Sequence, residues 1–244
     1  MAQIGQDQYP LGYAWRNPEY LDSEGVEFME FRLTYEGFLP SSGNASRHVK
    51  YKHKIRRAFH TQLSKLWREH PCLAAKWEKF PFLPPRAKQA IRVFQERGYV
   101  KDAPTGLTTI DVLARQFDRC GYQFVPLVNE RFDLVCGLDV LFLRRGIPGD
   151  LIMPGGDVDN RIKTLFDALR VPKDGSEIDG PPGANESPFF CLLQDDSLIT
   201  EFKVTTDQLL KPMRPNQNES EVVLIVQVTV KATKVTLENL QLIS

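Results

Sequence analysis

Three charged residues stand close together in one short segment. The stretch GGDVDNRIKTLFDAL, residues 155–169, places Asp157 and Asp159 two positions apart, and Lys163 follows one helical turn after the second aspartate. An unpaired buried charge would be costly, so these carboxylates need a partner. Mg²⁺ binds a few carboxylates, keeps several waters and takes phosphate oxygens as further ligands. The group therefore predicts Mg²⁺-dependent phosphodiester hydrolysis, with Mn²⁺ as a substitute ion and the lysine stabilising charge on the phosphate.

The pattern around these residues predicts a helix. Apolar residues recur at helical spacing over 162–169, which fixes one face against a core. Asp159, Lys163 and Asp167 follow one another at spacings of four and form a separate stripe. We expect Asp157 to precede the helix in non-helical backbone, so that its carboxylate and that of Asp159 converge.

Simpler roles exist for each residue taken alone. Asp159 could be a helix cap, and Lys163 with Asp167 a surface pair worth a few tenths of a kcal/mol. The later QDDS, residues 194–197, could be a plain turn. A calcium-binding EF-hand loop is excluded, because Arg161 stands where a ligand is needed and Ile162 where that loop needs glycine.

Charge is distributed unevenly along a chain of 244 residues whose net charge is zero. The segment from Ser41 to Lys101 holds 15 Lys and Arg residues and only three acids, a charge of +12, so the remainder carries −12. This asymmetry is typical of a surface that binds a polyanion, joined to an acidic or metal-binding region. A solvated helical face is the alternative explanation.

The order of elements predicts an α+β fold with a mixed β-sheet of about four to five strands flanked by helices. Alternating apolar residues predict strands over 26–37, 131–143 and 221–235, and two short strands that meet at Asp195 and Asp196. Residues 46–69 read as a long helix, and 86–98 and 108–121 as two more, the last with Thr108 and Asp111 spaced as a capping box.

We divide the chain into an N-terminal arm, residues 1–25, and a single domain, residues 26–244. The domain carries a helical insertion at about 71–125 and a long loop at about 170–190. No run is apolar enough to span a membrane and the start lacks a signal peptide, so we expect a cytoplasmic protein.

Cysteine and histidine form no metal-binding pattern. The four cysteines, Cys72, Cys120, Cys136 and Cys191, contain no close pair and are interpreted as buried thiols. The four histidines fall in one stretch and are interpreted as polar surface residues, with contact to phosphate as the alternative role, namely His48, His53, His60 and His70.

The segment D-V-D-N-x-x-K-x-x-x-D-A-L, residues 157–169, followed by D-D-S-L-I, residues 195–199, resembles the RusA family of Holliday-junction resolvases. The resemblance covers residues 26–70 and 130–235, and it implies a RusA-like fold and a homodimer. It also implies that Asp157, Asp159 and Asp196 bind the metal and, with Lys163, catalyse the reaction, while Asn160 and Asp195 support them. The chain differs from compact members in its length, its insertion and its long loop.

These observations favour a Mg²⁺-dependent endonuclease that resolves Holliday junctions or other branched DNA. The basic helix is expected to contact backbone phosphates through Arg47, Lys50, Lys52, Lys54 and Arg57. One alternative keeps the metal site but acts on flap or linear DNA, or on RNA, in a phage or defence context. Another is a non-catalytic DNA-binding protein on the same fold.

Overall fold

The described part of the chain comprises residues 26–40, 45–74, 76, 107–145, 157–210, 221–236 and 239 of a computed structural model. The predicted arm at 1–25 and the predicted helix at 86–98 lie outside these residues. Within them, no helix is both long enough and apolar enough to cross a membrane.

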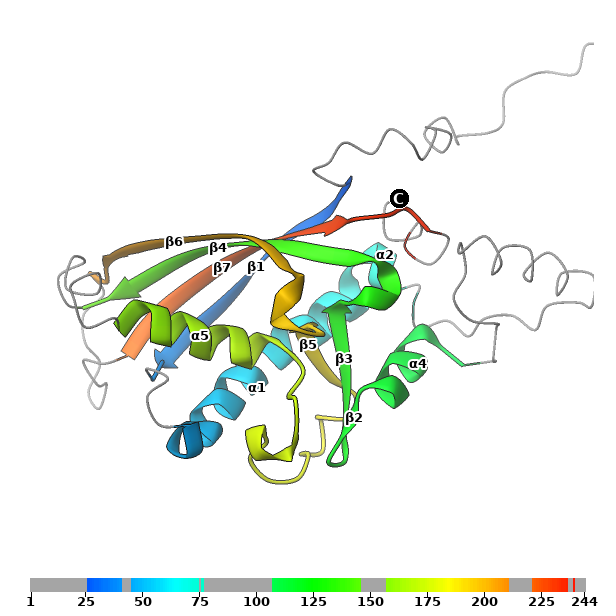
Figure 1. Cartoon of the computed structure of the whole chain (residues 1–244), viewed down its shortest axis with the longest axis horizontal. Coiled ribbons are helices and arrows are strands. Elements are labelled where there is room, and N and C mark those ends of the chain that lie inside the picture. Colours follow the sequence, from blue (N-terminus) through cyan, green and yellow to red (C-terminus); the bar gives the residue numbers. More distant parts are fainter. Residues whose placement is uncertain are drawn as a thin grey trace, which may run out of the picture.

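A four-stranded mixed sheet forms the upper layer in Figure 1. Its strands are β1 (Val26–Phe38), β7 (Glu221–Ala232), β4 (Leu134–Arg144) and β6 (Ile199–Gln208), in that spatial order. β7 runs antiparallel to β1 and β4, whereas β4 and β6 are parallel. Every second side chain of β7 is buried, because alternate residues face the helices. The predicted α+β class and these four strands are confirmed.

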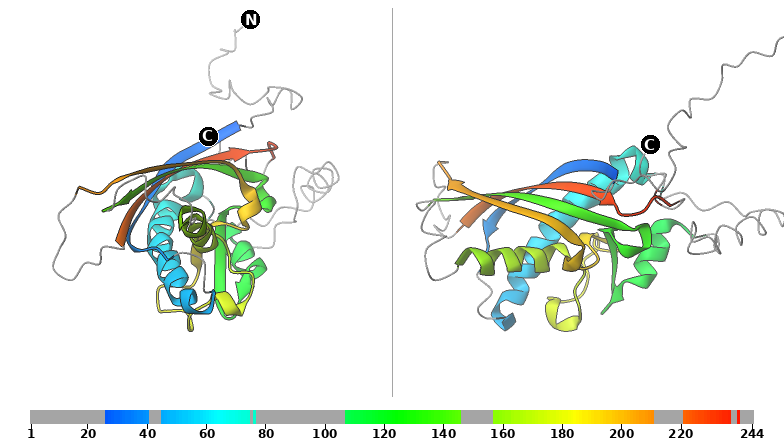
Figure 2. Two further views of the ribbon diagram at one scale, coloured as in Figure 1. Left: turned by 60° about the vertical axis from the view of Figure 1, so that its left-hand side comes forward. Right: turned by 45° about the horizontal axis from the view of Figure 1, so that its top comes forward.

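Two helices, α1 (Ala45–Glu69) and α5 (Asp157–Leu169), lie against one face of this sheet, as both views in Figure 2 show. The apolar stripe predicted for the first helix is buried, with Ile55, Phe59 and Leu63 each at most 1% exposed. These side chains fill the space between α1 and the sheet. A four-residue helix, α2 (Pro71–Ala74), follows α1 and buries Cys72 and Leu73.

A second sheet of three strands was not predicted. It consists of β2 (Asp118–Arg119), β3 (Tyr122–Val128) and β5 (Phe189–Leu193), and β3 pairs with β5 in parallel. The helix before it, α4 (Thr109–Gln116), carries the predicted capping box of Thr108 and Asp111. The helix predicted over 108–121 ends at Gln116, and the insertion predicted to be helical at about 71–125 also contains β2 and the start of β3. Both faces of β3 are buried, so its sequence shows no polar alternation that would mark a strand.

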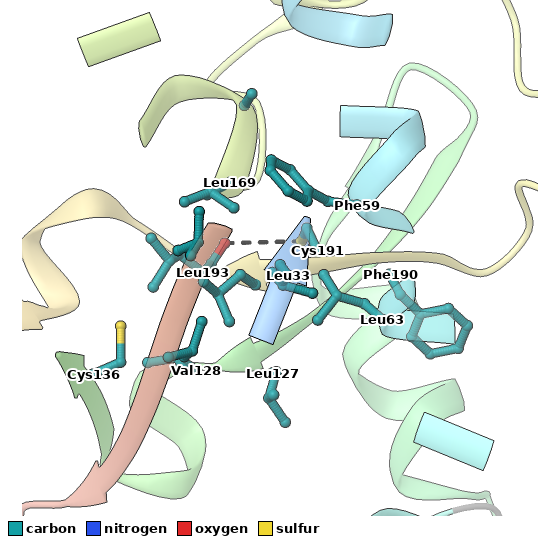
Figure 3. Close-up of a cluster of buried hydrophobic side chains, with 14 of the residues drawn as sticks. Leu33, Phe59, Leu63, Leu127, Val128, Cys136, Leu169, Phe190, Cys191 and Leu193 are labelled. Carbon is teal, nitrogen blue, oxygen red and sulfur yellow. Dashed lines mark hydrogen bonds between the residues drawn. The ribbon is translucent and has the colours of Figure 1, made fainter. Parts of the chain in front are cut away.

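The core lies where the two sheets and two helices meet. Figure 3 shows Leu33 of β1, Phe59 of α1 and Leu169 of α5 gathered around Cys191 and Leu193 of β5. Short 3-10 helices connect the larger elements, among them η3 (Glu130–Phe132), η5 (Gly175–Glu177) and η6 (Asp196–Leu198). Three of the four cysteines are buried free thiols, as predicted, but Cys120 is exposed.

Candidate functional site

The N-terminal end of α5 presents polar side chains to solvent. Asp159, Asn160 and Lys163 are all exposed. The helix begins at Asp157 itself, so this residue is helical and does not precede the helix as predicted. Acidic residues in a first turn interact favourably with the helix dipole, which is a sufficient local reason for this start. The side chain of Asp157 lies outside the described part of the structure.

Packing on the opposite side of α5 fixes its orientation. Ile162, Leu165, Ala168 and Leu169 are each at most 5% exposed against the core. The guanidinium of Arg161 donates a hydrogen bond to the carbonyl of Leu39, just after β1. Because these contacts hold one face of the helix, Asp159 and Lys163 stay on the other face.

Buried ion pairs hold the C-terminal end of α5. The ammonium of Lys52 lies 2.6 Å from the carboxylate of Asp167, and the guanidinium of Arg170 lies 2.7 Å from the same carboxylate. Arg170 also pairs with Glu177 at 2.9 Å. Burial alone would raise the pKa of Asp167, but the hydrogen bonds from Lys52 and Arg170 hold it below its usual value. The carboxylate of Asp167 is therefore engaged within the protein by Lys52 and Arg170.

Arg56 joins the same end of α5 to α1 and η5. Its side chain is 1% exposed, and it donates hydrogen bonds to the backbone carbonyls of Asp167 at 2.9 Å and Glu177 at 3.1 Å. Burial lowers the pKa of this guanidinium to about 10, so it remains charged at neutral pH. Carbonyls at a helix C-terminus carry partial negative charge, which suits a buried cation.

The pair Asp195–Asp196 lies between β5 and β6, as predicted, at the start of η6. Asp195 caps η6, since its carboxylate accepts a hydrogen bond from the backbone N–H of Ser197 at 3.1 Å. Hydrogen bonding from Ser197 lowers the pKa of Asp195, with a contribution from the charge of Lys173. The interpretation of QDDS as a turn is therefore confirmed for Asp195, which caps η6. Asp196, beside it, is half-buried.

Asp159 and Asp196 lie at opposite ends of α5. The N–H of Val171, just after the helix, donates to the carbonyl of Leu193 at 2.9 Å, so the turn that follows β5 is beside the helix C-terminus. β6 then runs back along α5, with the Phe202 and Phe166 rings 5.0 Å apart (Figure 1). Asp159 to Leu169 spans about 15 Å at 1.5 Å per residue.

One chain therefore does not bring the predicted metal-binding aspartates together. Among the residues that the structure describes, no cluster of three or more His, Cys, Asp or Glu side chains could hold an ion. What one chain offers at the start of α5 is the pair Asp157 and Asp159. One or two carboxylates suffice for Mg²⁺ when water and phosphate oxygens complete the coordination, so the donor set at this end fits the ion in number and type.

The residues predicted to bind DNA have different surroundings. Lys50 and Lys54 are exposed on α1. Lys52 instead pairs with Asp167, and the guanidinium of Arg57 lies 2.5 Å from the carboxylate of Glu186. The side chain of Arg47 is outside the described part. Two of the five residues predicted to contact DNA, Lys52 and Arg57, thus form ion pairs within the protein, although the side chain of Arg57 remains 41% exposed.

Two histidines were misinterpreted as surface residues. His53 is fully buried and His60 is 7% exposed. The Nδ1 of His60 accepts a hydrogen bond from the N–H of Phe190 at 2.9 Å, so its Nε2 donates to the carbonyl of Asn185 at 3.0 Å. Both lie at helical spacing with Arg56 beside the apolar stripe of α1. That spacing is the signal that could have revealed a wider buried face.

A polar cavity of about 610 Å³ lies along the second half of α1. Arg57, Lys65 and Arg68 line it from the helix, and Asn185 and Ser187 from the chain before β5. Glu69 and Glu186 also line the cavity and pair with Lys65 and Arg57, respectively. Its net charge is therefore small, and it is less suited to a polyanion than the exposed lysines at the other end of α1.

Comparisons with protein-family models, with curated proteins and with solved structures find no match to this chain.

Proposed function

We propose that this chain is a Mg²⁺-dependent endonuclease that cuts branched DNA, with the Holliday junction as its main substrate. The observation that carries this proposal is the exposure of Asp159 and Lys163, one turn apart, at the start of a helix whose other end is fixed by buried ion pairs. Such a helix can hold functional side chains in a constant orientation, which catalysis requires.

Asp157 and Asp159 would hold the ion at the first turn of α5. When bound, Mg²⁺ would lower the pKa of an attacking water and stabilise the leaving oxygen. The ammonium of Lys163 would stabilise negative charge on the scissile phosphate, and the exposed amide of Asn160 could donate a hydrogen bond to a phosphate oxygen. Lys50 and Lys54 would contact neighbouring phosphates without reading sequence.

A site that also uses Asp196 needs a second copy of the chain, because Asp159 and Asp196 of one copy are separated by the length of α5. A homodimer would supply two symmetric sites, which suits the two incisions that a two-fold symmetric junction requires. The cytoplasmic location expected from the sequence agrees with a DNA substrate.

Cleavage assays with four labelled substrates test this proposal: a four-way junction, a flap, a linear duplex and a single strand, each with Mg²⁺ or EDTA. We expect paired symmetric cuts in the junction that require the ion. Asp159→Asn should abolish cutting and leave DNA binding intact or tighter. Asp118→Asn, which changes an exposed aspartate in the second sheet, is the matched control and should cut normally.

The other outcomes distinguish the alternatives. Metal-dependent cutting of flap or linear DNA, or of an added RNA substrate, would keep the site and change the substrate class. Normal cutting by Asp159→Asn would refute the assignment of the site. Tight DNA binding with no cutting in Mg²⁺ or Mn²⁺, and no metal uptake by calorimetry, would support a binding protein without catalytic activity.

A further inference from the structure

The two edges of the four-stranded sheet differ. β1 and β6 are the edge strands. At the β1 edge, the amide of Gln62 on α1 accepts a hydrogen bond from the N–H of Thr34 at 2.9 Å and donates to its carbonyl at 2.7 Å. Among the described residues, no side chain of another element bonds to the backbone along the outer edge of β6. An unprotected edge of this kind can pair with another strand.

The free edge of β6 is formed by its even-numbered residues. The N–H of Leu209 donates to the carbonyl of Arg144 in β4 at 2.6 Å. Because backbone groups alternate in direction along a strand, the N–H and C=O groups of Phe202, Val204 and Thr206 point away from β4. Three consecutive donor and acceptor pairs are therefore presented to the outside.

Exposed apolar side chains accompany this edge. Phe202 of β6 is 46% exposed, and Leu210, two residues beyond the strand, is 83% exposed. Tyr51 on α1 is the only other large apolar side chain in the described residues with comparable exposure, at 40%. Phe202 packs edge-on against Phe166 of α5, so it is held in place at the edge and its exposed part is available to a partner.

The charges of β6 favour a second copy of the same strand. In an antiparallel pair related by a two-fold axis at Phe202, Glu201 of each copy faces Lys203 of the other. These are non-hydrogen-bonded positions, where opposed side chains approach most closely and opposite charges stabilise the pair. Within one chain, Glu201 is held by Lys231 at 2.7 Å and Lys203 by Asp139 at 2.9 Å. Both are thus already oriented on the outer face of the sheet.

We propose that β6 pairs antiparallel with β6 of a second copy, and that the two four-stranded sheets become one continuous sheet. The interface is self-complementary in its backbone hydrogen bonds, in the two Phe202 rings and in the two Glu201–Lys203 pairs. It does not depend on nuclease activity, because it rests on the sheet edge alone.

Two proline variants provide a matched test. Val204→Pro removes an N–H that points to the free edge, whereas Thr205→Pro removes one that points to β4. Sedimentation velocity, without DNA or metal, should give a dimer for the wild type and a folded monomer for Val204→Pro. Thr205→Pro should lower the melting temperature of the chain itself. A wild-type monomer at high concentration, or an intact dimer in Val204→Pro, would overturn the proposal.

Charge reversal tests the register even if proline perturbs the fold. Glu201→Lys places two lysines opposite each other across the interface, and Lys203→Glu places two glutamates there. Each variant alone should dimerise with a dissociation constant raised about tenfold or more. An equal mixture of the two should form heterodimers, since each lysine then faces a glutamate. No preference for the heterodimer would refute this register. Junction cutting is assayed separately, so either proposal can fail without the other.

Discussion

The two ends of α5 use charged residues in opposite ways. At the C-terminal end, Lys52, Asp167 and Arg170 satisfy one another inside the protein, and Arg56 bonds to backbone carbonyls. At the N-terminal end, Asp159 and Lys163 are exposed. The first arrangement fixes where the helix lies and the second leaves its charges to an outside ligand. Changes at the first end should therefore alter stability, and changes at the second should alter activity.

The largest loss of stability should come from Arg56→Met. The substitution leaves the carbonyls of Asp167 and Glu177 without their buried donor, so the free energy of unfolding should fall by about 3 kcal/mol or more. Urea denaturation measures this. Lys54→Met, two residues earlier and exposed on the same helix, should change it by less than about 0.5 kcal/mol. Equal losses in the two variants would contradict the structural role of Arg56.

A loss of stability that is at most of similar size should appear on acidification through His53, which lies beside Arg56. Burial lowers the pKa of His53 to about 4 from 6.5. Between these values the unfolded chain binds a proton that the folded chain does not. The contribution of neutral His53 to the free energy of unfolding is therefore fully present above pH 6.5. It is lost as the pH falls toward 4, by roughly 3 kcal/mol. Chemical denaturation across this range should show a shallower decline for His53→Phe than for the wild type, and identical slopes would reject the assignment.

The smallest effect on stability should come from Lys163→Met at the exposed end. We expect the free energy of unfolding to change by less than about 0.5 kcal/mol, while junction cleavage falls by about a hundredfold or more. Lys65→Met, which removes an ammonium from a side chain that is 72% exposed, is the control and should cut normally. A stability loss in Lys163→Met comparable to that of Arg56→Met would remove the distinction between the two ends.

Local patterns predicted the strands of the main sheet and β5 of the second sheet, but not β2 and β3. The alternation in β1, β4 and β7 and the capping box of α4 each depend on residues close in the sequence, so they could be read directly. β3 could not, because its burial on both faces removes the alternation. Its parallel pairing with β5 also joins residues as distant as Phe124 and Phe189, and no local signal marks such a contact.

The same limit explains what was missed in the candidate site. The spacing of Asp159 and Lys163 predicted correctly that both lie on one side of a helix, and the structure shows that both are exposed there, whereas Asp167 of the same stripe is buried. It could not show that Asp167 pairs with Lys52 of α1, since that choice depends on how two helices pack. Nor could the order D-V-D followed by D-D reveal the distance between Asp159 and Asp196, because β6 returns along α5 only in the folded chain.

The Gln62 side chain has a consequence for the size of any assembly. Sheets that can grow at both edges form open fibres, whereas a two-fold pair with only one available edge closes after two copies. In a dimer joined through β6, both outer edges are β1 strands, and at each the Gln62 amide engages the backbone of Thr34. In such a dimer the Gln62 amide would occupy the backbone donor and acceptor of Thr34 at each outer edge, and so would oppose further growth of the sheet beyond two copies.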